Sequence, residues 1–118
     1  VRQFGLWHER ALSLHDDGAR IEGRDRLAHQ GRSGDVQHQF DIRFHLHPVV
    51  RATREDHRSV HISTEQGESW LFTAKRGDVT LEESIHFAGI AGPVRSHQIV
   101  VSGMWPQIDK VEWIIRKT

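Results

Sequence analysis

The chain has 118 residues and equal numbers of basic and acidic side chains, 16 Lys and Arg against 16 Asp and Glu. This balance argues against a nucleic-acid-binding protein or a membrane-surface module, because both usually carry a basic excess. The sequence contains no Cys, which excludes disulfides, thiolate zinc sites and a cysteine nucleophile. No apolar run approaches the roughly 20 residues that a membrane helix needs. The length is typical of one domain.

The start of the chain carries no targeting signal that can be recognised. Residues 1–7 lack the basic start and the apolar segment of a secretory signal. No Met opens the chain. We therefore expect residues 1–118 to be a single domain, either a fragment or a processed product of a larger protein.

Alternation of apolar and polar residues dominates the sequence from the beginning. Two strand-like stretches, 11–14 and 19–27, flank an Asp-Asp-Gly sequence at 16–18. Gly accepts positive φ and Asp bonds its own backbone, so we predict a hairpin here. The next run, 40–47, alternates strictly and ends at Pro48, which cannot donate to a strand ladder. It predicts a strand with one buried and one polar face.

The rest of the chain continues in the same way. The sequence Arg-Gly-Asp at 76–78 matches an adhesion tripeptide, but we interpret it as a hairpin turn. We expect long loops at 28–37 and 88–94. Seven to nine short strands with frequent turns predict an all-β fold, an antiparallel β-sandwich. The later predicted strands are 60–63, 70–73, 79–87, 99–101 and 111–116.

His45 and His47 are the sharpest candidates for a metal site. Residues i and i+2 of a strand project from the same face about 7 Å apart, a spacing that can place two imidazoles on one metal. His61 or His86 could supply a third ligand. The competing interpretation is a solvated sheet face in a chain with ten His. We favour the solvated face, assign no metal site and expect no cofactor.

Pairs of carboxylates are available for acid and base chemistry. Those at 16–17 and 55–56 fall in predicted turns, where acidic residues are expected for backbone reasons. Glu83 differs, because the alternation places it on the apolar side of its strand. A buried carboxylate needs a cationic partner such as Arg43 or Arg95, so we favour a structural ion pair over a catalytic acid.

Aromatic and Arg side chains could recognise a carbohydrate. We expect Trp70 and Trp113 in the core, while Trp7 and Trp105 are candidates for exposed stacking positions. Thirteen of the 16 cations are Arg, whose planar guanidinium suits carboxylate or sulfate groups. Lys, Asn and Tyr share AT-rich codons and are all scarce, which favours codon bias as the origin of the Arg excess.

Three segments of the chain form a specific combination: Gly-Leu-Trp-His-Glu-Arg at 5–10, Ile-Glu-Gly-Arg-Asp-Arg-Leu at 21–27, and Phe-Asp-Ile-Arg-Phe-His-Leu-His-Pro at 40–48. The later segments 70–72, 81–85, 98–103 and 111–113 fit the same pattern. Together, along nearly the whole chain, these segments resemble the C-terminal part of heparinase II/III-like proteins.

The resemblance implies a polysaccharide lyase built from an α/α toroid followed by an antiparallel β domain. Such a lyase removes the C5 proton of a uronic acid and eliminates the 4-linked sugar, using Tyr and His as acid and base. This chain has no Tyr, no Asn and no His-x-His-x-Asp segment, so we expect no catalytic residue in it. The binding residues stay unassigned. A bacterial parent lyase would favour the periplasm.

The implied role is to pack against the toroid of the parent chain and to close one side of a cleft for acidic polysaccharide. The resemblance further implies that Arg10, Asp25 and Arg43 form buried or interface ion pairs. Two alternatives remain open. The first is a free-standing carbohydrate-binding sandwich, and the second is a metal-dependent enzyme that uses His45, His47 and a third His.

Overall fold

The computed structural model describes residues 2–3, 6–15, 18–29, 37–87, 89 and 92–118. These residues contain no helix that could span a membrane. The all-β prediction is confirmed, and the strand count exceeds the predicted seven to nine only through the two-residue β1. The ten strands are β1 (Arg2–Gln3), β2 (Leu6–His15), β3 (Arg20–His29), β4 (His38–His45), β5 (Arg51–Asp56), β6 (Ser59–Ser63), β7 (Ser69–Ala74), β8 (Asp78–Phe87), β9 (Pro93–Trp105) and β10 (Lys110–Lys117).

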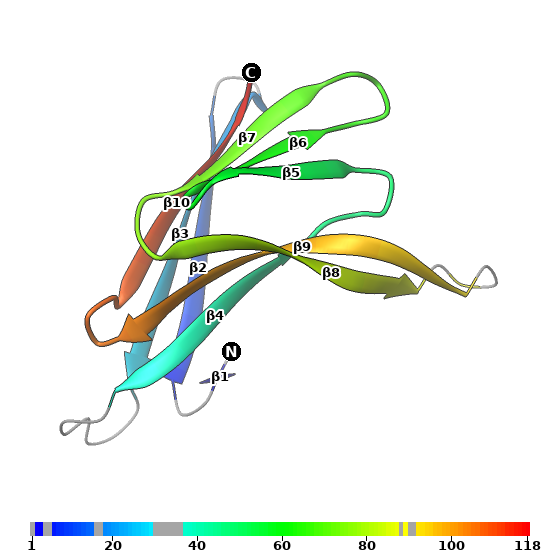
Figure 1. Cartoon of the computed structure of the whole chain (residues 1–118). Helices are drawn as coiled ribbons and strands as arrows, with labels where there is room; N and C mark the ends of the chain where they lie inside the picture. Colours follow the sequence, from blue (N-terminus) through cyan, green and yellow to red (C-terminus); the bar gives the residue numbers. More distant parts are fainter. Residues whose placement is uncertain (1, 4–5, 16–17, 30–36, 88, 90–91) are drawn as a thin grey trace.

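The strands form two antiparallel sheets that pack face to face, as predicted for a sandwich (Figure 1). The larger sheet has seven strands in the order β1-β2-β3-β10-β7-β6-β5, and the smaller has the order β4-β9-β8. One side of the sandwich is closed by hydrogen bonds between the sheets. Val79 of β8 donates its N–H to the His57 carbonyl at 2.9 Å, and Arg54 Nε of β5 donates to the Val79 carbonyl at 2.8 Å.

The predicted hairpin at the start of the chain is confirmed. Strands β2 and β3 pair in antiparallel register from Leu6 opposite His29 to His15 opposite Arg20. Gly18 has a φ of 90°, as its place in the turn requires. The two Asp residues at 16–17 lie outside the described residues.

The prediction of a hairpin turn at 76–78 is wrong. Strand β7 belongs to the larger sheet and β8 to the smaller, so these residues cross from one sheet to the other. The reason is that both edges of β7 are already occupied, by β6 and β10. Gly77 has a φ of 86°, and a Cβ there would lie 2.9 Å from the Ser102 carbonyl oxygen. Gly77 therefore allows the chain to pass close to Ser102 as it crosses between the sheets, and it does not form a hairpin turn.

Strands that are largely polar were not predicted from the sequence pattern, or were predicted shorter than they are. Strand β5 was not predicted; it is an exposed edge strand that pairs only with β6, with a bulge between Arg54 and Asp56. The residues at 55–56 thus lie in a strand, not in a turn. Strand β9 begins at Pro93, inside the predicted loop 88–94, and residues 88 and 90–91 lie outside the described residues. Of the predicted loop 28–37, the first two residues belong to β3 and 30–36 are also outside the description.

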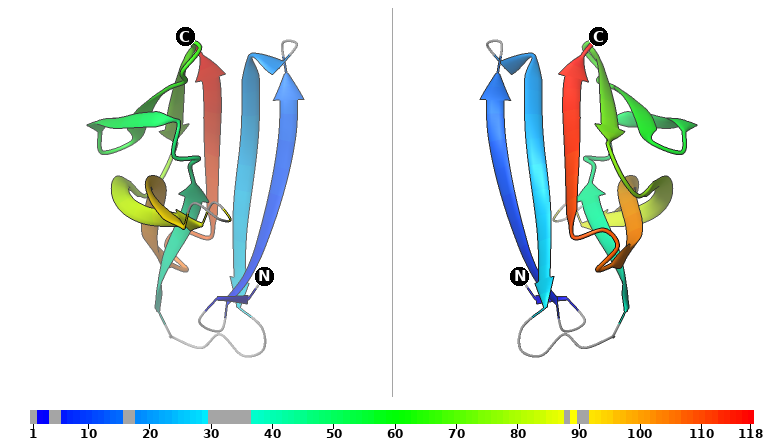
Figure 2. Two further views of the ribbon diagram at one scale, coloured as in Figure 1. Left: turned by 90° about the vertical axis from the view of Figure 1, so that its right-hand side faces the viewer. Right: turned by 90° about the vertical axis from the view of Figure 1, so that its left-hand side faces the viewer.

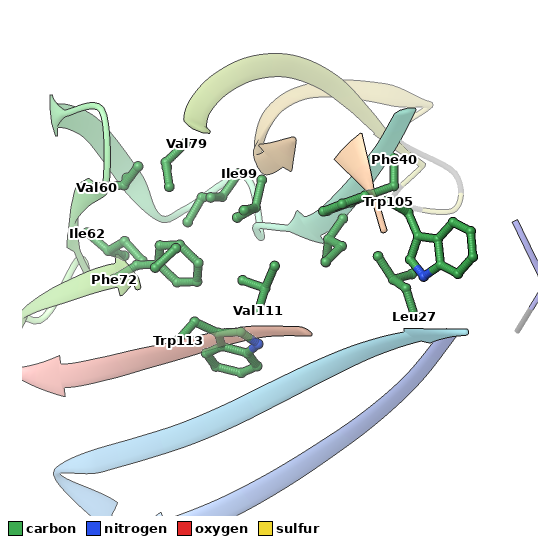
Figure 3. Close-up of a cluster of buried hydrophobic side chains, with 13 residues drawn as sticks. Leu27, Phe40, Val60, Ile62, Phe72, Val79, Ile99, Trp105, Val111 and Trp113 are labelled. Atoms are coloured by element: carbon green, nitrogen blue, oxygen red, sulfur yellow. The ribbon is translucent and has the colours of Figure 1, made fainter. Parts of the chain in front are cut away.

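The core fills the space between the sheets (Figure 3). Trp113 is 4 % exposed, as predicted, and Trp70 packs against the core. The prediction that Trp105 is exposed is wrong, since it is only 8 % exposed. Every second residue of β9 faces the core, and this alternation continues past Gly103 as far as Trp105. Trp7 is 45 % exposed, in line with its prediction. The buried residues labelled in the view are Leu27, Phe40, Val60, Ile62, Phe72, Val79, Ile99, Trp105, Val111 and Trp113.

The two sheets do not cover one another completely. Figure 2 shows β2 and β3 standing to one side of the other strands. Leu12 and Leu14 are on the face of β2 that also carries Arg10, and they are 63 % and 69 % exposed. The far end of β8 is also uncovered, so Ile85 is 63 % exposed and Glu83 is exposed. The predicted buried ion pair of Glu83 is therefore wrong, because no opposing sheet covers that end of the strand.

Candidate functional site

The most deeply buried charge among the described residues is the carboxylate of Asp25, with an exposed fraction of 0 %. Asp25 Oδ1 lies 2.5 Å from His8 Nε2 and accepts a hydrogen bond from Arg10 Nε at 2.7 Å. Asp25 Oδ2 accepts a hydrogen bond from Trp113 Nε1 at 2.6 Å. Both oxygens are thus satisfied, which a buried carboxylate requires. We call His8, Arg10, Asp25 and Trp113 the Asp25 cluster.

Strand register builds the Asp25 cluster. Asp25 of β3 lies opposite Arg10 on one side and Val111 of β10 on the other. Two pairs further along, on the same face, Gly23 lies opposite Trp113, and a Cβ at Gly23 would overlap the indole ring. The missing side chain at Gly23 therefore lets the indole lie flat over β3 and point its N–H at Asp25.

Arg10, whose side chain is 35 % exposed, packs against an aromatic ring. Its Cζ lies 4.4 Å from the centroid of the Phe44 ring, a cation–π contact. Phe44 in turn packs edge-on to Trp113, with ring centroids 5.0 Å apart. The Asp25 carboxylate is paired with Arg10 and accepts the Trp113 hydrogen bond, and the Phe44 ring contacts both Arg10 and Trp113. This arrangement is typical of a structural ion pair, and it joins the two sheets at their centre.

The expected ion pair of Arg10 and Asp25 is confirmed, whereas Arg43 differs from the expectation of a buried pair. Its side chain is 39 % exposed, and its nitrogens lie 3.5 Å from Asp41 and 3.4 Å from Glu82. The alternation of β4 directs Arg43 away from the core, on the face opposite to Phe44. Sequence reasoning identified the charged residues but could not assign their partners.

The candidate metal ligands are exposed. His45 ends β4 and His47 follows it, where its Nδ1 accepts a hydrogen bond from the Val49 N–H at 3.2 Å. His61 is on the outer face of the other sheet, because its strand neighbours Val60 and Ile62 are buried. The side chain of His86 lies outside the description. Among the described residues, no three His, Asp or Glu side chains gather as a metal site would require.

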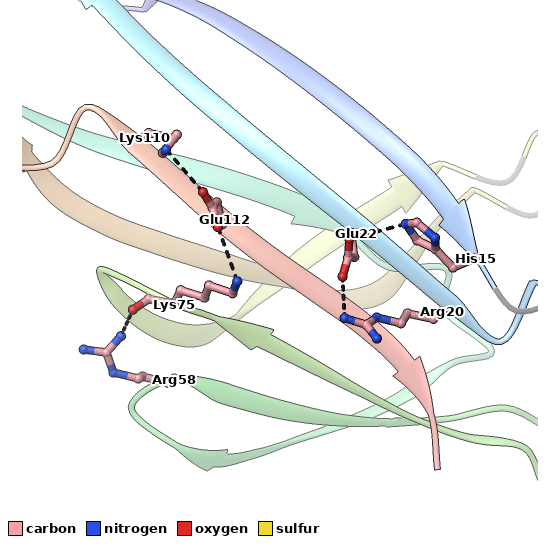
Figure 4. A network of polar contacts seen from close by, with 7 residues as sticks. All are labelled: His15, Arg20, Glu22, Arg58, Lys75, Lys110 and Glu112. Carbon is pink, nitrogen blue, oxygen red and sulfur yellow. Dashed lines mark hydrogen bonds and ion pairs between the residues drawn. The ribbon is translucent and has the colours of Figure 1, made fainter.

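A shallow trough of about 300 Å³ lies on the outer face of the larger sheet. Glu112 of β10 bridges Lys110 and Lys75, with nitrogen-to-oxygen distances of 3.2 and 3.3 Å (Figure 4). Hydrogen bonds from Lys110 first, and then from Lys75, lower the pKa of Glu112 from its usual value. Sequence reasoning did not find this trough, because its residues come from separate strands. The side chains around it include Ala11, Ser13, Glu22, Arg24, Lys75 and Glu112.

A second carboxylate at the trough is also paired. Glu22 lies between Arg20 and His15, and its Oε2 is 3.3 Å from His15 Nε2 (Figure 4). Both acidic groups of the trough are therefore engaged by cationic or imidazole groups. In contrast, no ion-pair partner is present for Arg24 within the described part of the chain. The trough thus presents one uncommitted guanidinium between two neutralised carboxylates.

Comparison with known proteins gives one curated relative and one family. The chain is 32% identical over 126 residues to FtsZ-localized protein C from Caulobacter vibrioides (strain NA1000 / CB15N), an alignment that covers 98% of this chain and 22% of that protein. The chain therefore spans about a fifth of the length of this relative. No solved structure matches the chain. The family described as Heparinase II/III-like, C-terminal, matches residues 1–114, and this chain belongs to that family.

Proposed function

We propose that this chain is a non-catalytic β-sandwich domain of a longer heparinase II/III-like polysaccharide lyase. Its role is to pack against the remainder of the parent chain and to close one side of the cleft for acidic polysaccharide. Family membership over residues 1–114 supports the lyase context. The curated relative is several times longer than this chain, which supports a role within a larger protein.

The observation that carries the packing role is the uncovered face of β2. Leu12 and Leu14 are 63 % and 69 % exposed on a strand whose neighbour β3 contributes to the core. Two adjacent large apolar side chains on an open sheet face are typical of a surface that is covered in a larger assembly. The remainder of the parent chain is the occupant we propose, because it is covalently tethered and therefore present at high effective concentration.

The non-catalytic role is supported by the chemistry of the described side chains. The buried Asp25 and its partners form a closed set of hydrogen bonds with both carboxylate oxygens used. Within the described residues, no group of three His, Asp or Glu side chains could hold a metal ion. Elimination at C5 of a uronate needs a base and an acid placed against the sugar, and we assign both to the rest of the parent chain.

The proposal is tested by following the unsaturated products of an acidic polysaccharide by their ultraviolet absorbance. The full protein is compared with its His45→Ala/His47→Ala variant and with an equally exposed His57→Ala control. We expect cleavage by the full protein and the same kcat in all variants. Absence of eliminase activity on sulfated and non-sulfated uronate polymers would refute the lyase assignment. A selective loss of kcat in the folded double variant would refute the non-catalytic role.

A second candidate follows from the curated relative, whose name describes it as localised to FtsZ. We propose as the alternative that the parent of this chain is also localised with FtsZ. The alignment over 98% of this chain supports this candidate. A fluorescent fusion of the full protein, imaged together with labelled FtsZ, tests it. Coincident signals are expected, and a uniform distribution of the fusion would exclude the alternative.

A further inference from the structure

We propose that the outer face of β2, β3 and β10 is a binding site for an acidic oligosaccharide. Arg24 and Arg26 hold its carboxylate or sulfate groups, and Trp7 stacks on a sugar ring. This face is the reverse of the one that carries Leu12 and Leu14, because side chains alternate along β2. The inference rests on the proposed function for the class of ligand and on the residues of this face for the site.

This face carries more cations than carboxylates. The whole chain has no net charge, yet the outer positions of the three strands and the adjoining Lys75 hold six cations and three carboxylates. A neutral protein that collects cations on one face creates a local field that attracts anions. The cations are Arg20, Arg24, Arg26, Lys75, Lys110 and Arg116, and the carboxylates are Glu9, Glu22 and Glu112.

Some like charges lie opposite one another on these strands. Arg26 lies directly opposite Lys110, and Arg20 lies directly opposite Arg116. Like charges at directly opposed positions destabilise an antiparallel pair. An anion bound between two such strands would neutralise both members of a pair. Arg26 also lies opposite Glu9, Lys110 is paired with Glu112, and Arg20 is paired with Glu22, so these carboxylates offset part of the repulsion. A bound anion would relieve the rest.

Some charged side chains of this face are already in ion pairs and others are not. Glu112 is held by Lys110 and Lys75, and Glu22 by Arg20 and His15, so the carboxylates of the trough are neutralised (Figure 4). Within the described part of the chain Arg24, Arg26 and Arg116 form no ion pair. Two of these, Arg24 and Arg26, are adjacent outward positions of β3. Their planar guanidinium groups can bind carboxylate or sulfate oxygens in bidentate fashion.

The shape of the face favours a sugar over other anions. The floor of the trough is formed by Ala11, Ser13 and the backbone of Gly23, which leaves a hollow of about 300 Å³, near the lower end of the range for ligand pockets. Trp7 is on the outer face of β2, as are Ala11 and Ser13, and it is 45 % exposed. An exposed indole offers a flat apolar surface to the C–H face of a sugar ring. An acidic saccharide can use this indole and the two Arg side chains together.

The test measures binding to the full natural protein by calorimetry. The probes are a sulfated heparin-derived hexasaccharide and a non-sulfated uronate hexasaccharide. We expect Arg24→Gln/Arg26→Gln to weaken binding of both probes about tenfold or more and to reduce its salt dependence. Trp7→Ala should weaken binding of both sugars several-fold. The matched control is Arg51→Gln/Arg95→Gln, which removes two exposed charges elsewhere and should bind like the parent protein.

Three results would overturn the proposal. The first is unchanged affinity in Arg24→Gln/Arg26→Gln with the melting temperature preserved. The second is an equal loss in the Arg51→Gln/Arg95→Gln control, which would indicate bulk electrostatics. The third is equally tight binding of a single-stranded DNA of matched charge that depends on the same Arg pair, which would indicate a site without preference for sugars. Each variant surface is exposed, so folding is not at risk, and circular dichroism verifies this.

Discussion

At the scale of single residues, one buried carboxylate organises the centre of the molecule. Asp25 of β3 accepts hydrogen bonds from Arg10 of β2 and Trp113 of β10, and it contacts His8 of β2. The sequence resemblance singled out Arg10, Asp25 and Arg43 as charged residues. It could not tell that Arg10 pairs with a fully buried carboxylate while Arg43 pairs with exposed ones, because pairing depends on which face of each strand the register presents.

Asp25→Ala is expected to destabilise the protein by about 1–3 kcal/mol, because it leaves the buried Trp113 N–H without its acceptor, whereas the Arg10 side chain is 35 % exposed and can be solvated. Chemical denaturation measures the change in the free energy of unfolding. The control is Arg43→Ala, whose exposed pairs at 3.4 and 3.5 Å should contribute about 0–1 kcal/mol. Equal losses in the two variants would contradict the assignment of Asp25 as the central buried charge.

Glu112 provides a pH-dependent contribution at the surface. Hydrogen bonds from Lys110, and then from Lys75, hold the pKa of Glu112 below its usual value of 4.5. The unfolded chain therefore takes up this proton first as the pH falls. The stabilisation is complete above about pH 4.5 and is lost as the pH falls through the lowered pKa of the folded protein. Asp56 acts in the same direction, because the Arg58 backbone N–H lowers its pKa.

Glu112→Gln should accordingly reduce the slope of melting temperature against pH below about pH 5. Differential scanning calorimetry between neutral and acidic pH measures this slope. Glu55→Gln is the matched control, since Glu55 is exposed and forms no ion pair in the described structure. An unchanged slope in Glu112→Gln would mean that the Lys pairing of Glu112 does not contribute to stability.

At the scale of elements, strands with one apolar face were predictable and polar strands were not. The strict alternation of Phe40, Ile42 and Phe44 predicts β4, and the alternation of Val111 and Trp113 predicts β10. Strand β5 is an exposed edge strand and carries no apolar stripe. Its sequence therefore shows no alternation from which its pairing with β6 could be predicted. The crossover at 76–78 was not predictable either, since a turn sequence does not reveal which sheet the next strand joins.

Close packing between elements depends on Gly23. Because a Cβ at this position would overlap the Trp113 ring, Gly23→Ala is expected to displace the indole and to cost about 1–3 kcal/mol of unfolding free energy. Ser13→Ala, on the neighbouring strand and the outer face, should be nearly neutral. The mutational test is a double cycle with Trp113→Phe. A cost of Gly23→Ala that persists undiminished in the Trp113→Phe background would show that the indole is not the obstacle.

At the scale of the whole molecule, the sandwich is closed along one side and open along the other. Hydrogen bonds from Val79 and Arg54 join β8 to the β5–β6 region, whereas β2 carries exposed leucines on its inward face. The outward face of the same strands is hydrophilic and basic. The sequence predicted the sandwich and the family, but neither surface. The basic face combines residues from β2, β3 and β10 that only the register brings together. Leu12 and Leu14 are on β2 alone, and their exposure follows from the smaller sheet leaving this part of β2 uncovered.

The central claim is that the rest of the parent chain covers Leu12 and Leu14. It is tested most directly by thiol labelling of the full protein, with Leu14→Cys compared with Ile85→Cys, since these positions are 69 % and 63 % exposed in this domain. Labelling at each site is followed by mass spectrometry of the peptides. The account predicts that Cys at position 14 reacts at least about tenfold more slowly than Cys at position 85, as expected for a covered apolar surface. Equal labelling rates at the two positions would contradict it.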